Sequence, residues 1–206
     1  ADASREHASE GERTLAPAAL AAPSARSVQA EAKREVVFIE DNLPDYLKLA
    51  ESARQGAEVV VLDHTQDGLQ QMIAALQGCQ VDAIHLVTHG ANGQVDLGST
   101  RLSVSNVDAR AGQLAQLGQS LSADGDLLLY GCDVGGGASG SSFLDSLARH
   151  TGADVAASSD TTGSAGYGNW TGAASATLIG AGRTARDLVP RIVAALDSAA
   201  ASADAG

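Results

Sequence analysis

The chain has 206 residues, 44% of them hydrophobic but only 3% aromatic, so it can form one domain with a core of aliphatic side chains. Its formal net charge of −12 argues against a nucleic-acid partner, because affinity for phosphate backbones comes from clustered Lys and Arg. No apolar run approaches the roughly 20 residues that a membrane-spanning helix needs, so no membrane span is expected.

The two ends of the chain differ from its middle. Residues 1–34 are rich in Ala, Ser, Glu and Arg and are interrupted by Pro17 and Pro23, a composition typical of disordered segments. Residues 183–206 begin with a stretch that can form a short helix and end in ASADAG, which is typical of a linker. The prediction is one folded domain over residues 35–182, between two flanking segments.

Within this domain, short apolar runs alternate with segments of helical periodicity. We expect a hairpin after the third strand, formed by residues 94–97 and 101–103 around the turn residues GST. The expected strands are 36–40, 58–63, 83–88, 126–130 and 154–158, and the expected helices are 44–55, 68–76, 107–117 and 141–150.

This alternation predicts an α/β three-layer sandwich, with a mostly parallel sheet and helices on both faces. Continuous rather than alternating apolar strands fit a sheet that is covered on both sides. Ligands of such sheets bind outside the carboxyl ends of the strands. Reactive residue types follow every expected strand here, as Glu-Asp, Asp-His, His-Gly, Gly-Cys-Asp and Ser-Asp.

The strongest candidate site combines the ends of the third and fourth expected strands. His89 precedes Gly90, and Cys132 follows Gly131. A thiol needs a base or a lowered pKa to attack a carbonyl near neutral pH, and a histidine provides either. Glycines at such turns let backbone N–H groups reach a developing oxyanion. The pattern predicts that Cys132 is the nucleophile and His89 the base. It also predicts that the N–H groups of Gly90 and Cys132 form the oxyanion hole.

Each half of this pair also has a plain structural interpretation. A histidine at a strand end is commonly structural, and a lone cysteine is commonly a small buried hydrophobe. A disulfide between Cys79 and Cys132 is a further possibility in a secreted protein. It conflicts with the expected geometry, because Cys79 precedes the third strand. A strand of that length rises about 20 Å, and a disulfide needs Cα atoms within about 7 Å.

Other hydrolase and metal interpretations fit less well. HGANG is similar to an oxyanion motif of some lipases, but no G-x-S-x-G elbow accompanies it. His150 follows Cys132 too closely for the papain order of residues. His85 lies mid-strand and His64 ends another strand, so no tight set of zinc ligands is formed. We therefore expect neither a metal nor a cofactor.

The segments AIHLVTHG and DLLLYGCDVG resemble the caspase-like (clan CD) cysteine peptidases, which include caspases, gingipains, legumains, separases and self-cleaving toxin domains. The chain more closely resembles an uncharacterised domain near the N-termini of giant bacterial repeat adhesins and type I-secreted proteins. This resemblance covers about residues 34–178. It is carried by REVVFIEDNLPDY, GAEVVVLD, DAIHLVTHGANGQVDLG, DLLLYGCDVG and TGADVAASSDTTG. It implies a caspase-like fold, a His–Cys dyad that requires no third member, and an extracellular or cell-surface location in bacteria. No Asn or Asp is obvious as an orienting residue.

In several relatives, an acidic residue after the strand equivalent to 154–158 helps to form a pocket for a basic P1 side chain. By this resemblance Asp160 is assigned to substrate binding, and Asp133, next to the candidate nucleophile, is assigned with it. The alternative for Asp160 is a turn role in SSDTTG. Residues 56–182 contain three basic and twelve acidic residues, a balance that would attract cationic substrates and would equally serve solubility.

The predicted function is a cysteine endopeptidase whose substrate is a peptide or protein, including its own flanks or parent chain. Eight of the 13 basic residues lie in those flanks. The alternative is a non-catalytic, adhesin-associated binding module of the same fold. A flavodoxin-like small-molecule binder is disfavoured because no glycine-rich phosphate loop follows the first strand, although GCDVGGGASGSS could hold an anion at a helix N-terminus.

Overall fold

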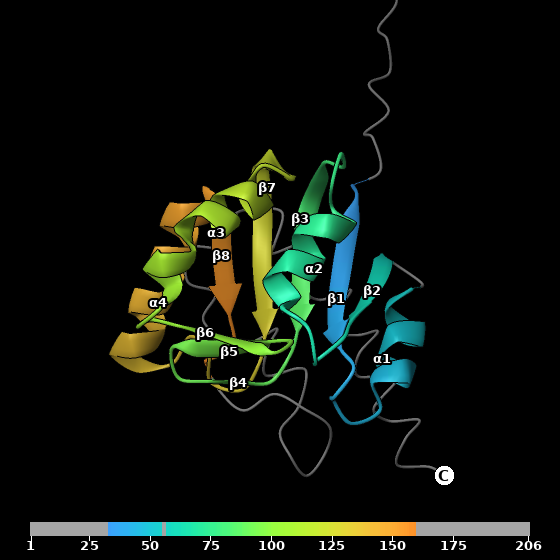
Figure 1. Cartoon of the computed structure of the whole chain (residues 1–206), viewed down its shortest axis with the longest axis horizontal. Helices are drawn as coiled ribbons and strands as arrows, with labels where there is room; N and C mark the ends of the chain where they lie inside the picture. The colour runs from blue at the N-terminus through green and yellow to red at the C-terminus, as the bar shows by residue number, and fades with distance from the viewer. Residues whose placement is uncertain (1–32, 55–56, 160–206) are drawn as a thin grey trace, which may run out of the picture. The chain divides into compact units, whose positions relative to one another are not determined.

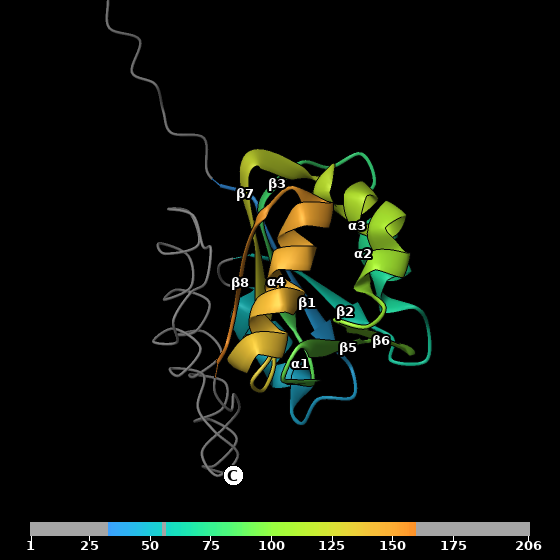
Figure 2. The ribbon, with the colours of Figure 1, turned by 90° about the vertical axis from the view of Figure 1, so that its left-hand side faces the viewer.

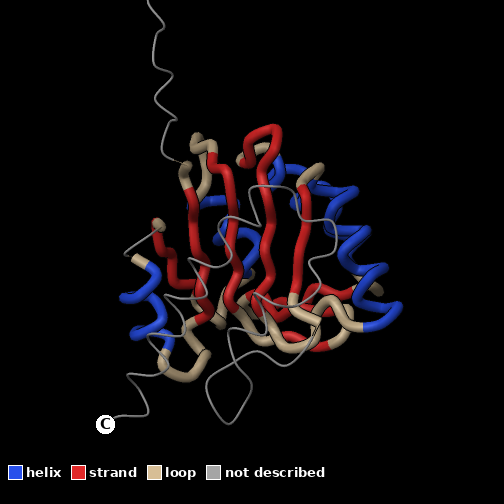
Figure 3. The backbone as a smooth tube through the Cα atoms, turned by 180° about the vertical axis from the view of Figure 1, so that it is seen from behind, coloured by secondary structure: helices blue, strands red, loops and turns tan. Residues whose placement is uncertain are grey.

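The computed structural model describes residues 33–54 and 57–159. All of them belong to the second of the two units into which the chain divides, Ala32–Gly206. Their central feature is a parallel sheet of five strands, which lie side by side in Figures 1 and 3. The strands are β1 (Glu35–Glu40), β2 (Glu58–Leu62), β3 (Val81–Val87), β7 (Leu121–Tyr130) and β8 (Asp154–Ala157).

The sheet has the order β2-β1-β3-β7-β8, and every neighbouring pair is parallel. The chain therefore adds strands first on one side of β1 and then on the other. All carboxyl ends meet at one edge of the sheet. The expected α/β class and the mostly parallel sheet are confirmed, and β3 and β7 are neighbours.

Helices flank both faces of the sheet. Alternate β1 residues point to opposite sides: Val36 and Phe38 belong to one core cluster, and Val37 and Ile39 to another. The first cluster packs beneath three helices, which stand together on one side of the sheet in Figure 2, and the second packs beneath the remaining one. The three are α2 (Gly68–Ala75), α3 (Ala111–Gly118) and α4 (Gly137–Thr151), and the other is α1 (Tyr46–Ala53).

A small antiparallel sheet lies at the carboxyl ends of the parallel strands, below their arrowheads in Figure 1. It consists of β4 (Gly90–Ala91), β5 (Gln94–Leu97) and β6 (Thr100–Ser103), in that order. Its apolar side chains, Val95, Leu97 and Leu102, are buried in the core beneath α2–α4. The predicted hairpin is thus present, with β4 as an additional short strand beside it.

Several boundaries differ from the expectation. β7 begins at Leu121 rather than at residue 126, and α4 begins at Gly137 rather than at residue 141. The helix expected over 107–117 is divided into a 3-10 turn, η1 (Val107–Arg110), and α3. Of the two flanking segments, only residues 33 and 34 are among the described residues. The end of the predicted domain, residues 160–182, lies outside them. Within the described part, no helix is long and apolar enough to cross a membrane.

Candidate active site

The pairing of β3 with β7 brings the predicted dyad to one level of the sheet. Val87 pairs with Tyr130, and the N–H of Thr88 donates to the carbonyl of Tyr130 at 3.1 Å, so the ladder continues past the end of β3. His89 and Cys132 each follow these paired residues by two positions, in the turns that leave the two strands. Neighbouring strands lie about 4.8 Å apart, so both residues lie at the same edge of the sheet, just beyond two adjacent strand ends.

The two turns that carry His89 and Cys132 touch each other through their glycines. A Cβ built on Gly131 would lie 3.4 Å from Cα of Gly90 and 3.2 Å from the carbonyl oxygen of Thr88. A Cβ on Gly90 would lie 2.5 Å from Cγ2 of Val134, closer than real carbon atoms approach. The absence of a side chain at Gly90 and Gly131 is what lets these turns pack directly.

The side chains of His89 and Cys132 are both accessible to solvent at the carboxyl edge of the sheet. His89 is exposed and Cys132 is half-buried. Both cysteines are thiols in the structure. Cys79 lies beyond the other end of β3, where its N–H donates to the carbonyl of Leu76 at 2.9 Å and its thiol interacts with Arg34. The two thiols therefore lie near opposite ends of the parallel strands.

Asp133 directs its carboxylate back into its own loop. A Cβ on Gly136 would lie 2.1 Å from Oδ1 of Asp133, which places this carboxylate against the residue that precedes α4. A negative charge is favoured at the N-terminus of a helix. Asp133 also has a φ of 55°, a left-handed conformation that Asp tolerates better than most residues. The glycine-rich turn that could hold an anion therefore already has a carboxylate beside it. Asp160, the second predicted substrate-binding residue, lies outside the described residues.

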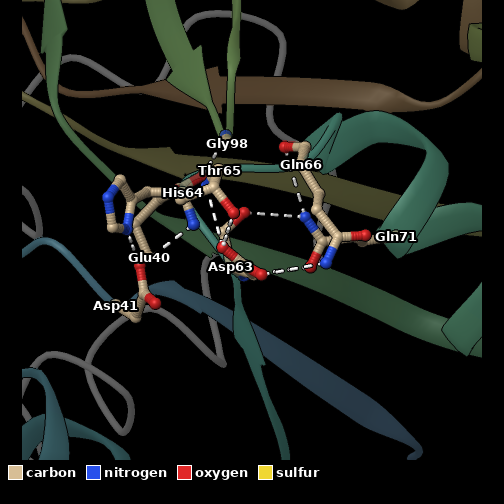
Figure 4. A network of polar contacts seen from close by, with 8 residues as sticks. All are labelled: Glu40, Asp41, Asp63, His64, Thr65, Gln66, Gln71 and Gly98. Atoms are coloured by element: carbon tan, nitrogen blue, oxygen red, sulfur yellow. Dashed lines mark hydrogen bonds and ion pairs between the residues drawn. The ribbon is translucent and has the colours of Figure 1, made fainter.

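A second polar cluster lies at the ends of β1 and β2, next to the turn of the hairpin (Figure 4). Asp41 accepts from both the backbone N–H and Nδ1 of His64 through Oδ1, at 3.0 and 2.7 Å. Asp41, Asp63 and His64 offer ligand atoms within 4.8 Å of one another, so these three residues could hold a metal ion. Hydrogen bonds from the hydroxyl and N–H of Thr65 lower the pKa of Asp63 to about 2. This grouping follows from two adjacent strands that end in Glu-Asp and Asp-His.

Glu40 is the buried member of this region, with a relative exposure of 1%. Its Oε1 accepts from the N–H of Gly98 at 2.6 Å, while its Oε2 has no hydrogen-bond partner within the described part of the chain. Burial raises the pKa of Glu40 to about 7, and the nearby Asp41 and Asp96 act in the same direction. Sequence reasoning placed Glu40 at the strand end but did not anticipate its burial.

His85 lies within the sheet and away from this edge. Its Nδ1 is 3.0 Å from the hydroxyl of Tyr130, and its Nε2 is 3.6 Å from Oε2 of Glu35. Burial lowers the pKa of His85 and raises that of Tyr130. The imidazole is therefore held neutral in the core, as a buried polar contact between strands rather than part of the edge.

The fold and the site together define an α/β domain with a parallel sheet and a thiol and an imidazole at its carboxyl edge. Residues 36–197 match the family described as "Domain of unknown function (DUF4347)". The match spans more than half of the chain, which therefore belongs to this family. No curated protein matches the chain.

Solved structures similar to the chain are distant. The protein lin1944 from Listeria innocua shares 19% identity, with 60% of this chain and 76% of that one covered and a TM-score of 0.33. BdcA in complex with NADPH shares 12% identity, with coverage of 60% and 68% and a TM-score of 0.33. Likenesses this weak carry no argument about the function of this chain.

Proposed function

We propose that the domain is a cysteine endopeptidase of caspase-like fold, in which Cys132 is the nucleophile and His89 is the base. The observation that supports this proposal is the parallel pairing of β3 with β7, since His89 and Cys132 follow the ends of these neighbouring strands on two turns that touch through Gly90 and Gly131. An activated thiol requires a base within hydrogen-bond reach. The exposure of His89 and the partial exposure of Cys132 leave both open to a substrate.

The chemistry follows from these two groups. The Cys132 thiol gives its proton to the imidazole of His89, and the thiolate attacks the carbonyl carbon of the scissile bond. The imidazolium then protonates the leaving amine as the C–N bond breaks, and water hydrolyses the resulting thioester with His89 as base. Asp96 donates its N–H to the carbonyl of His89 and Gly90 pairs with Val95. In this ladder the N–H of Gly90 points away from β5, as an oxyanion donor here would need, with the N–H of Cys132 as the second donor.

Charge supports a preference for basic substrates. Three of the carboxylates at this edge, Asp41, Asp63 and Asp96, are at least partly exposed. The negative charge of the whole chain, −12, raises the local concentration of cationic peptides. We assign recognition of a P1 Arg or Lys to Asp160, with Asp133 adding negative charge beside the nucleophile. The substrate would be an exposed segment of a surface or secreted protein, or of this chain itself.

Thiol labelling tests the dyad without a known substrate. In the wild type, iodoacetamide should label Cys132 much faster than Cys79, because the proposed base, His89, acts on Cys132 alone. Cys79, which has the Arg34 guanidinium beside it, serves as an internal reference that His89→Ala should not change. His89→Ala should remove this difference. Equal labelling of the two cysteines in the wild type would instead indicate a non-catalytic binding module.

Activity on peptides with P1 Arg or Lys gives the second measurement. Cys132→Ala and His89→Ala should each lower kcat/KM by several orders of magnitude, because the members of a dyad act as a unit. Cys79→Ala is the matched control and should leave activity unchanged. Near-full activity of Cys132→Ala on a peptide that the wild type cleaves would refute the assignment of the nucleophile.

A further inference from the structure

The small sheet places an acidic side chain directly opposite His89. The N–H of Asp96 donates to the carbonyl of His89 at 2.9 Å, and Gly90 pairs with Val95 in the next position of the ladder. His89 therefore extends β4 by one residue and faces Asp96 across the strand pair. On the other side of β5, Asp96 pairs with Arg101 of β6.

Burial shows that these three side chains share the outer face of the small sheet. Val95 and Leu102 pair with each other and are 1% and 2% exposed, so they point into the core. Residues that alternate with them point the opposite way. Accordingly, His89 and Arg101 are exposed and Asp96 is partly exposed. Directly opposite side chains of an antiparallel pair have Cβ atoms about 4.5–5.5 Å apart, so His89, Asp96 and Arg101 form one continuous row.

The middle position of this row is held in place. Oδ1 of Asp96 accepts from Nε of Arg101 at 2.7 Å. The hydroxyl of Thr88 donates to the backbone carbonyl of Asp96 and, at 3.2 Å, to that of His89. Thr88 thus ties the two strands together at the level of the row. A carboxylate has about four sites for accepting hydrogen bonds, so the contact with Arg101 leaves capacity for a second donor. Among the described residues the Asp96 carboxylate forms its ion pair with Arg101, and a contact with His89 requires a rotation of the imidazole.

We propose that Asp96 is a positioning residue for His89, an inference that rests on the proposed function. Its carboxylate orients the imidazole toward Cys132 and stabilises the imidazolium that forms when the thiol gives up its proton. The proton stays on His89 until it passes to the leaving amine. The row thereby supplies the orienting carboxylate that no sequence motif indicated.

Two variants separate this role from that of a surface ion pair. Asp96→Asn keeps the shape of the side chain but removes its charge, and Arg101→Gln breaks the same ion pair while leaving the carboxylate opposite His89. A purely structural ion pair would make the two variants behave alike. We expect Asp96→Asn to slow iodoacetamide labelling of Cys132 about tenfold at neutral pH, and to move the pH at which labelling becomes fast upward by about one unit. Arg101→Gln should stay within about threefold of the wild type, and Asp96→Glu should restore most of the rate.

The labelling of Cys79 in the same samples reports on the fold, together with urea unfolding of each variant. If wild-type Cys132 reacts no faster than Cys79, the proposed dyad is wrong and the role of Asp96 falls with it. If the wild type is activated but Asp96→Asn keeps its rate and its pH profile, only the role of Asp96 is wrong. Equal losses in Asp96→Asn and Arg101→Gln would likewise overturn the inference and leave a structural ion pair.

Discussion

Among the carboxyl groups at the carboxyl edge of the sheet, Glu40 is the one whose pKa burial changes most. It is buried at the end of β1, beneath the turn of the β5–β6 hairpin, and only one of its oxygens accepts a hydrogen bond from the described residues. Its pKa of about 7 lies above that of an unfolded Glu, roughly 4.3. A carboxyl of this kind favours the folded state when it is protonated, and that contribution is lost as the pH rises through about 7.

Replacing Glu40 with Gln should therefore stabilise the protein at high pH. The neutral amide can still accept from the N–H of Gly98 and does not have to ionise in a buried position. At pH 8 the free energy of unfolding of Glu40→Gln should exceed that of the wild type by about 2–4 kcal/mol. The difference should shrink toward pH 5, where wild-type Glu40 is protonated in the fold. Urea denaturation at the two pH values measures both quantities.

Glu51→Gln provides a matched control, because Glu51 is an exposed residue of α1. It should change the stability by less than about 0.5 kcal/mol at either pH. If Glu40→Gln shows the same pH dependence of unfolding as the wild type, the carboxyl of Glu40 is not the group that titrates.

Residues at the edge differed in how far they could be predicted. His89 and Cys132 could be proposed as site residues because each lies just beyond an apolar strand, and strand ends can be read from local sequence. Asp96 and Glu40 were not, because their roles depend on the hairpin folding back over the parallel strands. Asp96 stands in an ordinary alternating strand, and only its register opposite His89 distinguishes it.

At the scale of elements, the contact between α3 and α4 depends on a glycine. A Cβ on Gly118 would lie 1.9 Å from the carbonyl oxygen of Thr151, whereas a Cβ on Gly112 of the same helix would have nothing within 4 Å. Gly118→Ala should destabilise the protein by roughly 1–3 kcal/mol, because backbone atoms cannot move aside easily. Gly112→Ala should stabilise it by about 0.5–1 kcal/mol through the better helix propensity of Ala.

Thermal or urea unfolding of the two alanine variants measures this difference within one helix. A stabilisation of similar size in both would mean that α3 and α4 do not approach as closely as the structure indicates. Far-UV circular dichroism of both variants would show that the helix content is retained.

Most elements were predictable because their apolar periodicity is local. The exceptions are segments whose structure depends on packing. The first turn of α4 is GASG, a poor helix former by propensity. A Cβ on Gly140 would lie 2.3 Å from the carbonyl carbon of Gly135, so the small residue that weakens the helix is also what fits it against its own preceding loop. The start of β7, LSADG, has low strand propensity, and its pairing with β3 is irregular between Val81 and Ala83.

At the scale of the whole molecule, five basic residues of the described part form ion pairs with carboxylates, whereas Arg54, which is exposed, forms none with the described residues. Arg34 pairs with Glu58 at 3.0 Å, and its backbone N–H donates to Asp82 at 2.9 Å. Four others make similar contacts, namely Lys48, Arg101, Arg110 and Arg149. The remaining candidates for cleavage after a basic residue are Arg54 and, in the flanks, Arg5, Arg13, Arg26, Lys33, Arg183, Arg186 and Arg191.

If the proposed peptidase acts on its own chain, cuts should fall in these flanks. No cut is expected after Arg34, because Glu58 binds its side chain and Asp82 binds its backbone N–H. Tethering keeps a flanking site at an effective concentration of roughly millimolar, so the rate should not depend on protein concentration. Incubation of dilute protein under reducing conditions, followed by mass spectrometry of the new termini, measures both features. Cys132→Ala is the control and should stay intact, and a wild-type chain that also stays intact would restrict the enzyme to other proteins.

The pairing of β3 with β7 also governs the order of events when the chain folds. The turns that carry His89 and Cys132 belong to strands separated in sequence by the small sheet, η1 and α3. Parallel pairing across such a loop is slow, because the entropy of closing the loop is lost before the contacts form. His89 and Cys132, the residues of the proposed dyad, therefore reach the same edge only when this pairing forms. A growing chain that has not yet produced β7 holds His89 without its partner, so any chemistry at this edge waits until that strand has docked.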